Sequence, residues 1–336
     1  MSLIIPFFIH HRGCPHRCLF CNQVGIAGPN REGSDDPVTD LGRTIDAWLK
    51  RSAPHEEVQV AFYGGSFTCL DEDAQVGLLL QVRPYIEQGL VQSIRLSTRP
   101  DCITDTRVDF LVASGVRTVE IGAQSMNDQV LQKAVRGHTV EQVREAVHLL
   151  SARGMETGIQ LMAGLPGETT RSFLDGVRAV IGLSPQLVRL YPTLVLAHTE
   201  LAELYRRADW RPLSLERAVI LIARARTMLE DQRIRVIRMG LQPTSELEQQ
   251  LLAGPYHPAF GELVKSRCWY RKIRPLLIRA GRDKTVKLTI NGRDYSALAG
   301  QKRDNMKRLD SLPHGARLQV EIDPSMERGR FRYTIN

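Results

Sequence analysis

The run Gly13-Cys14-Pro15-His16-Arg17-Cys18-Leu19-Phe20-Cys21 directly follows an apolar stretch at residues 3–9 and gives the cysteine spacing C-x3-C-x2-C. Three soft sulfur ligands in one tight loop suit an iron–sulfur cluster. They would hold three irons of a [4Fe–4S] cube and leave the fourth iron open to another molecule. Electron-transfer clusters usually have every iron capped, so an open iron favours catalysis. The loop therefore predicts a catalytic cluster.

Two other interpretations of the loop compete. It could hold zinc with a nearby histidine as the fourth ligand, and the histidines within reach are His10, His11 and His16. It could also carry three unrelated thiols. Structural zinc sites usually combine two ligand pairs separated by a long insert. The other cysteines are isolated in the sequence, and we expect them to be small core residues or incidental thiols; they are Cys69, Cys102 and Cys268.

Length and composition describe an ordinary globular protein. The chain has 336 residues, 43% of them hydrophobic and 24% charged, which is enough to bury a large core. No apolar run approaches the roughly 20 residues of a membrane span, and the N-terminal run lacks the basic start of a signal peptide. Six cysteines in a chain of this length do not make a disulfide framework. We therefore expect no membrane association and a reducing, cytoplasmic location.

The positive charge is concentrated in one segment. The whole chain carries a formal net charge of +8. The segment from Lys265 to Arg308 contains fourteen Lys and Arg but only three Asp, a net charge of +11, which leaves −3 for the remainder. Such a segment is a candidate surface for an anionic partner, and its Trp269 and Tyr270 are candidate base-stacking groups.

The chain alternates between short β-branched runs and longer amphipathic stretches. We expect strands over residues 3–9, 58–62, 93–98, 117–122, 157–162, 187–191 and 233–239. Helices are expected over residues 38–51, 71–88, 104–114, 139–153, 169–182 and 215–231. Repeated strand–helix units imply a parallel sheet with right-handed crossovers. Polar residues gather at the ends of successive strands, which is typical of a barrel mouth. The predicted fold is α/β, a partial (β/α)6 barrel.

The alternation of strands and helices ends after Gly240. A short helix at residues 244–252 and a turn-rich link precede the basic segment and three further expected strands at residues 286–291, 317–323 and 331–335. We predict two domains, the barrel over residues 1–240 and a small basic α+β appendage over residues 241–336.

Several ordered motifs stand at the ends of the expected strands, between about residue 4 and residue 240. They are Cys14 to Cys21, Phe62-Tyr63-Gly64-Gly65-Ser66-Phe67, Ser97 to Asp101, Val119 to Ser125, Arg136-Gly137-His138-Thr139, Gly164 to Glu168, and Leu190-Tyr191-Pro192-Thr193. Together they resemble the radical S-adenosylmethionine (SAM) superfamily, and within it the branch of the Elongator catalytic subunit.

The resemblance implies an enzyme with two cofactors, a [4Fe–4S] cluster and SAM. Cys14, Cys18 and Cys21 would ligate the cluster. One electron from the cluster would cleave SAM to a 5′-deoxyadenosyl radical, which takes a hydrogen atom from the substrate. The buried lumen of a barrel would protect that radical from water.

The same resemblance implies which residues surround SAM. The turn of Tyr63, Gly64, Gly65 and Ser66 would receive the methionine amino group through its backbone. The residues on the ribose and methionine side would be Ser97, Arg99 and Glu120. Those holding hydroxyls and the carboxylate would be Gln124 and Arg136. Residues 161–164, with Met162 and Gly164 among them, would pack the adenine, and Phe20 would contribute backbone.

The resemblance is not complete. Elongator-type enzymes carry an acetyltransferase domain, for which residues 241–336 are too few, so the acetyl-CoA half of that chemistry is not carried over. An electron donor of the flavodoxin or ferredoxin type is expected. The expected substrate is RNA, in particular tRNA, bound through the basic segment. One alternative is a small anionic molecule, as in the related oxygen-independent coproporphyrinogen oxidases. Another is a non-catalytic, zinc-stabilised RNA-binding module.

Overall fold

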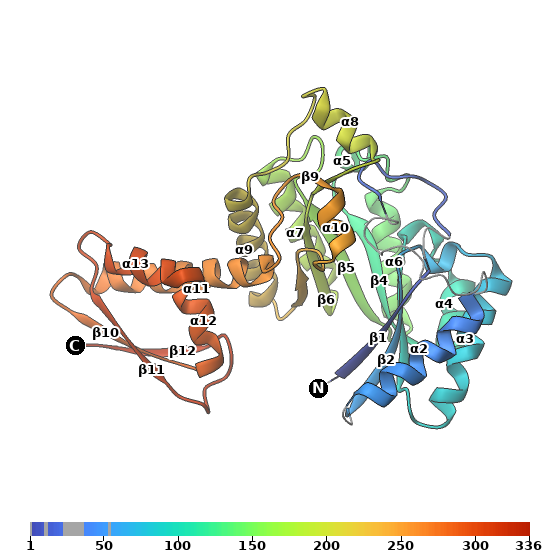
Figure 1. Ribbon diagram of the computed structural model, residues 1–336, viewed down its shortest axis with the longest axis horizontal. Coiled ribbons are helices and arrows are strands. Elements are labelled where there is room, and N and C mark those ends of the chain that lie inside the picture. The colour runs from blue at the N-terminus through green and yellow to red at the C-terminus, as the bar shows by residue number, and fades with distance from the viewer. Residues whose placement is uncertain (1, 10–12, 23–36, 53–54) are drawn as a thin grey trace. The chain divides into compact units, whose positions relative to one another are not determined.

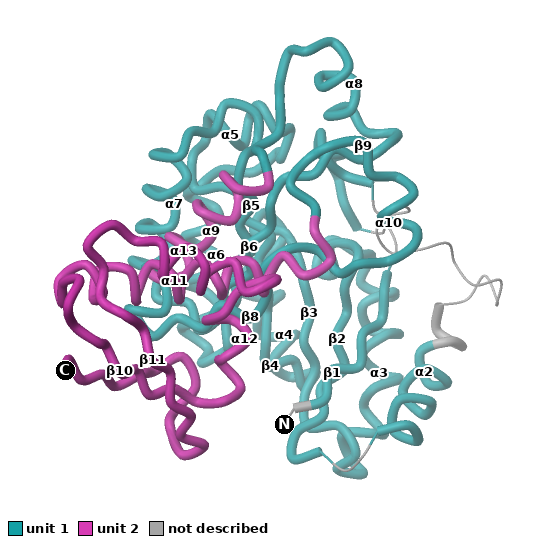
Figure 2. The backbone as a smooth tube through the Cα atoms, turned by 60° about the vertical axis from the view of Figure 1, so that its left-hand side comes forward, with its two compact units in different colours: residues 1–214, 228–256 teal, residues 215–227, 257–336 magenta. Residues whose placement is uncertain are grey.

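The computed structural model describes residues 2–9, 13–22, 37–52 and 55–336, which form two compact units (Figure 2). Unit 1 consists of Met1–Ser214 and Met228–Tyr256, and unit 2 of Leu215–Thr227 and His257–Asn336. The boundary between the units divides the helix at residues 215–231, because residues 215–227 lie in unit 2 and residues 228–231 in unit 1. Residues 241–256 also belong to unit 1. The domain division at residue 240 remains a prediction.

Unit 1 is built on a seven-stranded sheet in the order β1-β2-β3-β4-β5-β6-β8, in which every neighbouring pair is parallel (Figure 1). The strands are β1 (Ser2–Phe8), β2 (Glu57–Tyr63), β3 (Ser93–Thr98), β4 (Val116–Gln124), β5 (Glu156–Ala163), β6 (Leu187–Pro192) and β8 (Arg235–Met239). Consecutive strands are neighbours throughout, with β1 and β8 at the two edges. The predicted partial barrel is confirmed, and each of the seven strands expected before residue 240 corresponds to one strand of this sheet.

Helices and short 3-10 turns connect these strands. They are α2 (Pro37–Arg51), η1 (Phe67–Cys69), α3 (Glu72–Glu87), η2 (Pro100–Cys102), α4 (Asp105–Ala113), α5 (Asp128–Lys133), α6 (Val140–Ala152), α7 (Thr170–Leu183), α8 (Glu200–Arg206), α9 (Leu215–Asp231) and α10 (Ser245–Gln250). A small two-stranded sheet pairs β7 (Val195–Leu196) with β9 (Leu251–Ala253). Thr104 caps the start of α4 and Thr139 that of α6, and Thr139 forms a capping box with Gln142.

The two faces of the large sheet differ in chemistry. Residues at alternate strand positions, such as Val60, Ile94 and Val119, are fully buried on the face that packs against the helices. The positions between them bear polar side chains, and parallel register places them on one common face. This polar face, as we call it below, carries Tyr63, Arg95, Ser97, Thr118, Glu120, Glu156, Gln160, Arg189 and Tyr191. Such alternation leaves one face free to hold polar groups or a polar ligand.

Unit 2 packs helices on a three-stranded sheet of order β11-β10-β12. Its elements are the start of α9, α11 (Phe260–Ala280), β10 (Thr285–Ile290), η3 (Gly292–Asp294), α12 (Tyr295–Ala299), η4 (Gln301–Arg303), α13 (Asp304–Asp310), β11 (Arg317–Ile322) and β12 (Phe331–Ile335). Its core joins Trp269 and Leu277 of α11 to Leu288 of β10. The three strands expected here are confirmed. Helix α11 was not predicted, because its many arginines obscure the apolar stripe.

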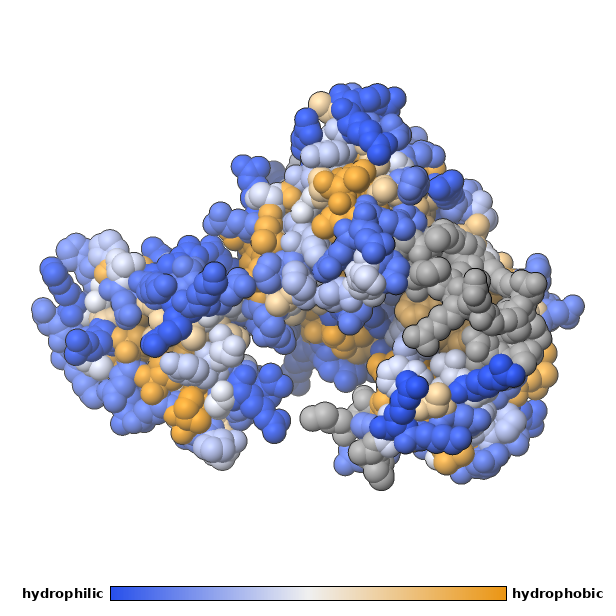
Figure 3. Space-filling view, in the orientation of Figure 1, coloured by the Kyte–Doolittle hydropathy of each residue, from blue (hydrophilic) through white to orange (hydrophobic). Residues whose placement is uncertain are grey.

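The basic segment is corrected in one respect. Trp269 is only 5% exposed and packs near Phe331, with ring centroids 6.0 Å apart, so it is a core residue and not a base-stacking group. Tyr270 is half-buried, with the guanidinium groups of Arg267 and Arg308 5.4 Å and 4.9 Å from its ring centroid. The surface over α11 and α13 is strongly hydrophilic in Figure 3. Among the described helices, none is long and apolar enough to cross a membrane.

Candidate active site

The cysteine loop follows β1 and is anchored at several points. The Leu19 amide donates to the Ala134 carbonyl (3.2 Å), and the Cys21 amide donates to the Cys18 carbonyl (3.0 Å). Cys14 is exposed, Cys18 buried and Cys21 half-buried, and all three are thiols. The loop therefore offers three sulfur donors of the kind that iron binds.

These thiols do not converge into a metal site by themselves. Within the described ranges, no three side chains of His, Cys, Asp or Glu lie close enough together to hold a metal ion. His16 packs against Gly137, where an added Cβ would lie 2.3 Å from the imidazole Cδ2. His10 and His11, the other candidate zinc ligands, lie outside the described residues.

Gly13 fixes the start of the loop against the turn after β2. Its φ is +79°, and an added Cβ would lie 2.2 Å from the Ser66 carbonyl oxygen and 2.9 Å from the Leu70 amide nitrogen. Both of those are backbone atoms, so no side-chain rotation could relieve the collision. The approach of the cysteine loop to this turn therefore requires glycine.

Replacing Gly13 with alanine should destabilise the protein more than the same change at Gly89. Gly89 also has a positive φ, +70°, but an added Cβ there would meet nothing within 4 Å. The Gly89→Ala variant should lose about 1–2 kcal/mol from the left-handed backbone alone. The Gly13→Ala variant should lose clearly more, because the collision adds to that cost. Urea unfolding of both variants measures the difference, and equal losses would contradict this packing.

The turn from Tyr63 to Ser66 leaves β2 with Gly64 at φ +84°. The Ser66 hydroxyl is buried and committed to neighbours. It lies 3.0 Å from Thr98 Oγ1 and accepts a hydrogen bond from the Arg99 amide (3.2 Å). This serine thus ties the turn after β2 to the end of β3. Gly65 is half-buried in the same turn.

The end of β3 holds a buried arginine. Arg99 is 3% exposed, pairs with Asp101 at 2.9 Å through both Nε and Nη2, and donates from Nη2 to the Arg136 carbonyl (2.6 Å). Arg99 and Asp101 therefore form a largely buried ion pair. The Arg99 Nη1 atom has no hydrogen-bond partner among the described residues. Ser97, two residues earlier, is half-buried with its hydroxyl 3.5 Å from the Phe62 carbonyl.

Arg136 connects the cysteine loop to β4. Its Nη1 donates to Cys18 Sγ (3.0 Å) and its Nη2 to the Gly122 carbonyl (2.5 Å). An added Cβ at Gly122 would lie 3.1 Å from Gln124 Nε2 and 3.4 Å from Arg136 Nη2, so both side chains lie over this glycine. Arg136 Nε and Gln124 Oε1 are buried and, within the described part of the chain, have no hydrogen-bond partner.

Glu120 lies in a buried ion cluster on the polar face. Its carboxylate pairs with Arg189 and accepts hydrogen bonds from Tyr63 Oη (3.1 Å) and Gln160 Nε2 (3.3 Å), while Arg95 Nη1 lies 3.4 Å away. Burial, with the Glu120 carboxylate beside it, raises the pKa of Tyr63 to about 12. Tyr63 therefore stays neutral and keeps donating to Glu120 at ordinary pH.

Sequence reasoning missed the arginines of this cluster. Arg95 and Arg189 interrupt apolar strands at alternate positions, the same signal that drew attention to Glu120. Arg95 is also 3.4 Å from Glu156, which pairs with Arg235 at 2.6 Å.

The end of β5 combines an apolar wall with a tight turn. Phe20 of the cysteine loop and Met162 pack against one hydrophobic cluster with Val130 and Leu165. Gly164, with φ +90°, donates its amide to Glu168 Oε2 (2.7 Å). The structure thus brings together Phe20 and Met162, which are far apart in the sequence and which the family resemblance assigns to the surroundings of SAM.

Two buried titratable groups flank this region. Burial lowers the pKa of His138 to about 3, helped by the charges of Arg136 and Arg99. Burial raises the pKa of Glu168 to about 7, against hydrogen bonds donated by the Gly164 amide, the Ser125 hydroxyl and the Leu165 amide.

Glu168 should make the protein less stable as pH rises. Its ordinary pKa of 4.5 rises to about 7 on folding, so the folded state retains a proton that the unfolded state has released. Its contribution is fully present below pH 4.5 and is lost as pH rises through about 7. The unfolding free energy of wild type relative to Glu168→Gln should fall by roughly 3 kcal/mol across this window. Denaturant unfolding at several pH values measures it, and a flat difference would contradict it; the contribution of His138 cancels in the comparison.

Comparison with known proteins identifies the family. The model of the Radical SAM superfamily matches residues 8–180, more than half of the chain, and that of the Radical_SAM C-terminal domain matches residues 185–270. The chain belongs to the radical SAM superfamily. Membership in this superfamily implies a [4Fe–4S] cluster and SAM, and the thiols of the cysteine loop are donors of the right chemistry.

Two curated relatives and one solved structure are similar to parts of this chain. A tRNA uridine(34) acetyltransferase of Methanocaldococcus infernus is 26% identical over 253 residues, 64% of this chain and 47% of the relative. The heme chaperone HemW of Haemophilus influenzae is 27% identical over 203 residues, 59% of this chain and 53% of the relative. The structure of M. infernus Elp3 lacking its N-terminus has a TM-score of 0.65 at 20% identity, over 82% of this chain and 63% of that one. The chain spans about half the length of these curated relatives.

Proposed function

We propose that this protein is an enzyme that cleaves SAM reductively and uses the resulting 5′-deoxyadenosyl radical to remove a hydrogen atom from its substrate. One observation carries the proposal. Three buried polar atoms have no hydrogen-bond partner in the described part of the protein: Arg99 Nη1, Gln124 Oε1 and Arg136 Nε. They belong to residues at the ends of β3 and β4 and beside the cysteine loop. Buried polar atoms need partners, and a polar ligand bound here would supply them.

In this proposal Cys14, Cys18 and Cys21 hold the cluster. When bound, the cluster supplies the single electron that cleaves the sulfonium C–S bond of SAM. Arg136 donates to Cys18 Sγ and places a positive charge beside that sulfur. Arg99 holds the Arg136 backbone, and Asp101 holds the Arg99 guanidinium. This chain of contacts fixes the orientation of the loop relative to the sheet.

The remaining proposed contacts to SAM come from four strand ends. The backbone of Tyr63, Gly64, Gly65 and Ser66 would receive the amino group. Ser97 and Glu120 would lie on the ribose side, and Arg189 holds the Glu120 carboxylate. Met162 and Gly164 would pack the adenine, and Phe20 would contribute backbone. The apolar packing of Phe20 and Met162 supports this part of the proposal.

We infer that the barrel comprises residues 1–240 and the basic domain residues 241–336. We also infer that the substrate is RNA, in particular tRNA. The tRNA-modifying relatives support this substrate, together with the exposed Lys and Arg of α11 and α13. An electron donor of the flavodoxin or ferredoxin type and a cytoplasmic location complete the proposal. A small anionic substrate is the second candidate, in which arginines of the polar face such as Arg95 and Arg189 would bind its carboxylates.

The test is SAM cleavage under anaerobic conditions. The protein is reconstituted with iron and sulfide, reduced with dithionite and given SAM, and 5′-deoxyadenosine is quantified with and without bulk tRNA. Wild type and Cys268→Ser, whose cysteine lies in unit 2, should form the product, whereas Cys14→Ala should not. Stimulation by tRNA supports an RNA substrate. Formation unaffected by tRNA favours the small molecule, and no formation by wild type would falsify the proposal.

A further inference from the structure

The structure joins Cys69 and Cys102 by a disulfide, a pairing that no pattern in the sequence indicates. The expectation that both are isolated thiols is therefore wrong. They are 33 positions apart, in the turns η1 and η2. Each turn follows one of two adjacent parallel strands, β2 and β3, whose carboxyl ends meet at the same edge of the sheet. Sheet topology thus brings together two residues that no local pattern connects.

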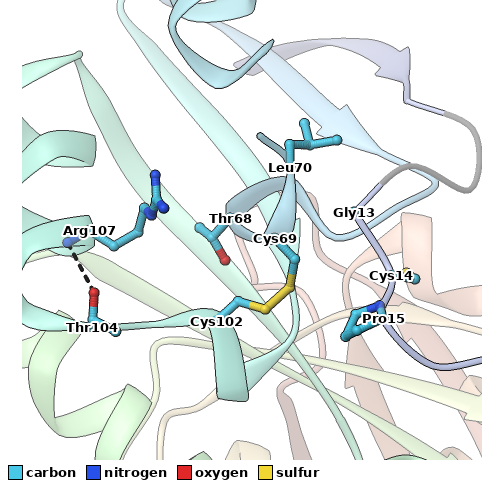
Figure 4. Close-up of a pocket in the computed structure, with 9 residues that line it drawn as sticks. All are labelled: Gly13, Cys14, Pro15, Thr68, Cys69, Leu70, Cys102, Thr104 and Arg107. Carbon is cyan, nitrogen blue, oxygen red and sulfur yellow. Dashed lines mark hydrogen bonds between the residues drawn. A yellow bond between two sulfur atoms is a disulfide. The ribbon is translucent and has the colours of Figure 1, made fainter. Parts of the chain in front are cut away.

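The disulfide shares an open pocket with the cysteine loop (Figure 4). The pocket has a volume of about 590 Å³, and its lining includes Cys14, Cys69, Cys102 and Arg107. Cys69 and Cys102 are half-buried, and Cys14 is an exposed thiol. A disulfide that solvent can reach and a thiol thus line one cavity.

The backbone of the cysteine loop also packs against the backbone at Cys69. An added Cβ at Gly13, the residue before Cys14, would lie 3.1 Å from the carbonyl carbon of Cys69. The Cys69 sulfur lies 2.9 Å from the Ser66 hydroxyl. One cysteine of the disulfide therefore belongs to the turn against which the cysteine loop packs.

Thiol chemistry makes this arrangement reactive. Disulfides exchange by attack of a thiolate on one sulfur, and exposed disulfides exchange more readily than buried ones. In the cytoplasmic location proposed above, disulfides are usually transient and catalytic or redox-sensing rather than structural.

We propose that Cys69–Cys102 is a redox-active disulfide that controls whether Cys14 is available to bind iron. In protein that lacks a cluster, the Cys14 thiolate attacks the Cys69 sulfur. A Cys14–Cys69 disulfide forms and Cys102 leaves as a thiolate, with no net oxidation. A dithiol reductant then supplies two electrons and two protons, is itself oxidised to a disulfide, and returns these cysteines to thiols. The inference rests on the proposed role of Cys14 as a cluster ligand.

Disulfide mapping of the full chain tests the exchange itself. Cluster-free protein is prepared without reductant or after treatment with dithiothreitol, alkylated at low pH, digested and examined by mass spectrometry. Without reductant we expect peptides linking Cys14 to Cys69 beside those linking Cys69 to Cys102. After dithiothreitol all six cysteines should be alkylated. Absence of any Cys14 disulfide would overturn the inference, whether or not the enzyme binds iron.

Iron loading tests the consequence. After removal of dithiothreitol, the reduced wild type should take up iron and sulfide, and the untreated wild type should lose most of that uptake. The Cys69→Ser/Cys102→Ser variant should load fully without dithiothreitol, and Cys268→Ser should behave as wild type. Equal loading of treated and untreated wild type would overturn the inference, and this comparison needs no variant to fold. If reduced wild type binds no iron, the proposed function fails instead.

Discussion

Replacing Glu120 with alanine is expected to lower the free energy of unfolding by about 3–5 kcal/mol, because it leaves a buried charge uncompensated. The Glu120 side chain is 1% exposed and that of Arg189 14% exposed, and the two are joined through both carboxylate oxygens. Removing the carboxylate would leave Arg189 with only the Tyr63 hydroxyl as a partner among these groups (2.8 Å). Urea unfolding at neutral pH measures the loss.

Two further variants separate the ion pair from simple truncation. Glu120→Leu combined with Arg189→Met removes both charges, and it should be far less destabilised than Glu120→Ala, since paired removal avoids an unpaired charge. Glu87→Ala breaks the exposed pair with Arg83, whose side chains are 61% and 67% exposed. That loss should be at most about 1 kcal/mol. If Glu120→Ala matched Glu87→Ala, the cluster would not stabilise the fold.

The strands and helices of unit 1 could be predicted because the periodicity of its apolar residues agrees with its helix caps and turn residues. Buried β-branched runs such as residues 93–98 alternate with amphipathic stretches, and caps such as Thr139 mark where helices begin. Helix α11 escaped prediction because it carries arginines and lysines around its apolar stripe and Pro275 within it. Its helical conformation depends on packing Trp269 and Ile273 against β10, a tertiary contact that no local pattern contains.

The candidate site shows the same limit. The cysteine loop is contiguous, so spacing alone identified it. Arg95, Arg189 and the pairing of Cys69 with Cys102 depend on which strands are neighbours, and strand order is a property of the whole sheet. An arginine inside an apolar run is visible in the sequence, but its partner is not.

Replacing Arg136 with methionine is expected to weaken SAM binding roughly tenfold or more, because a charge-assisted hydrogen bond to a buried group contributes about 1.5–3 kcal/mol. The guanidinium is 6% exposed and contacts Cys18 Sγ and the Gly122 carbonyl, and its Nε has no hydrogen-bond partner among the described residues. Methionine fills similar space but offers no donor. Equilibrium dialysis of reconstituted protein with SAM, together with bound iron per chain, measures both consequences.

The two measurements distinguish the roles that Arg136 could have. If its contact to Cys18 matters most, Arg136→Met should lose iron as well as SAM, and Arg136→Lys should restore iron better than SAM, since lysine keeps the charge but lacks the forked donors. If Arg136 chiefly holds the ligand, iron should stay at the wild-type level. Arg178→Met, at an exposed pair with Asp175, should change neither quantity. Wild-type iron and wild-type SAM affinity in Arg136→Met would contradict both roles, because the buried polar atoms around Gly122 would then serve the fold alone.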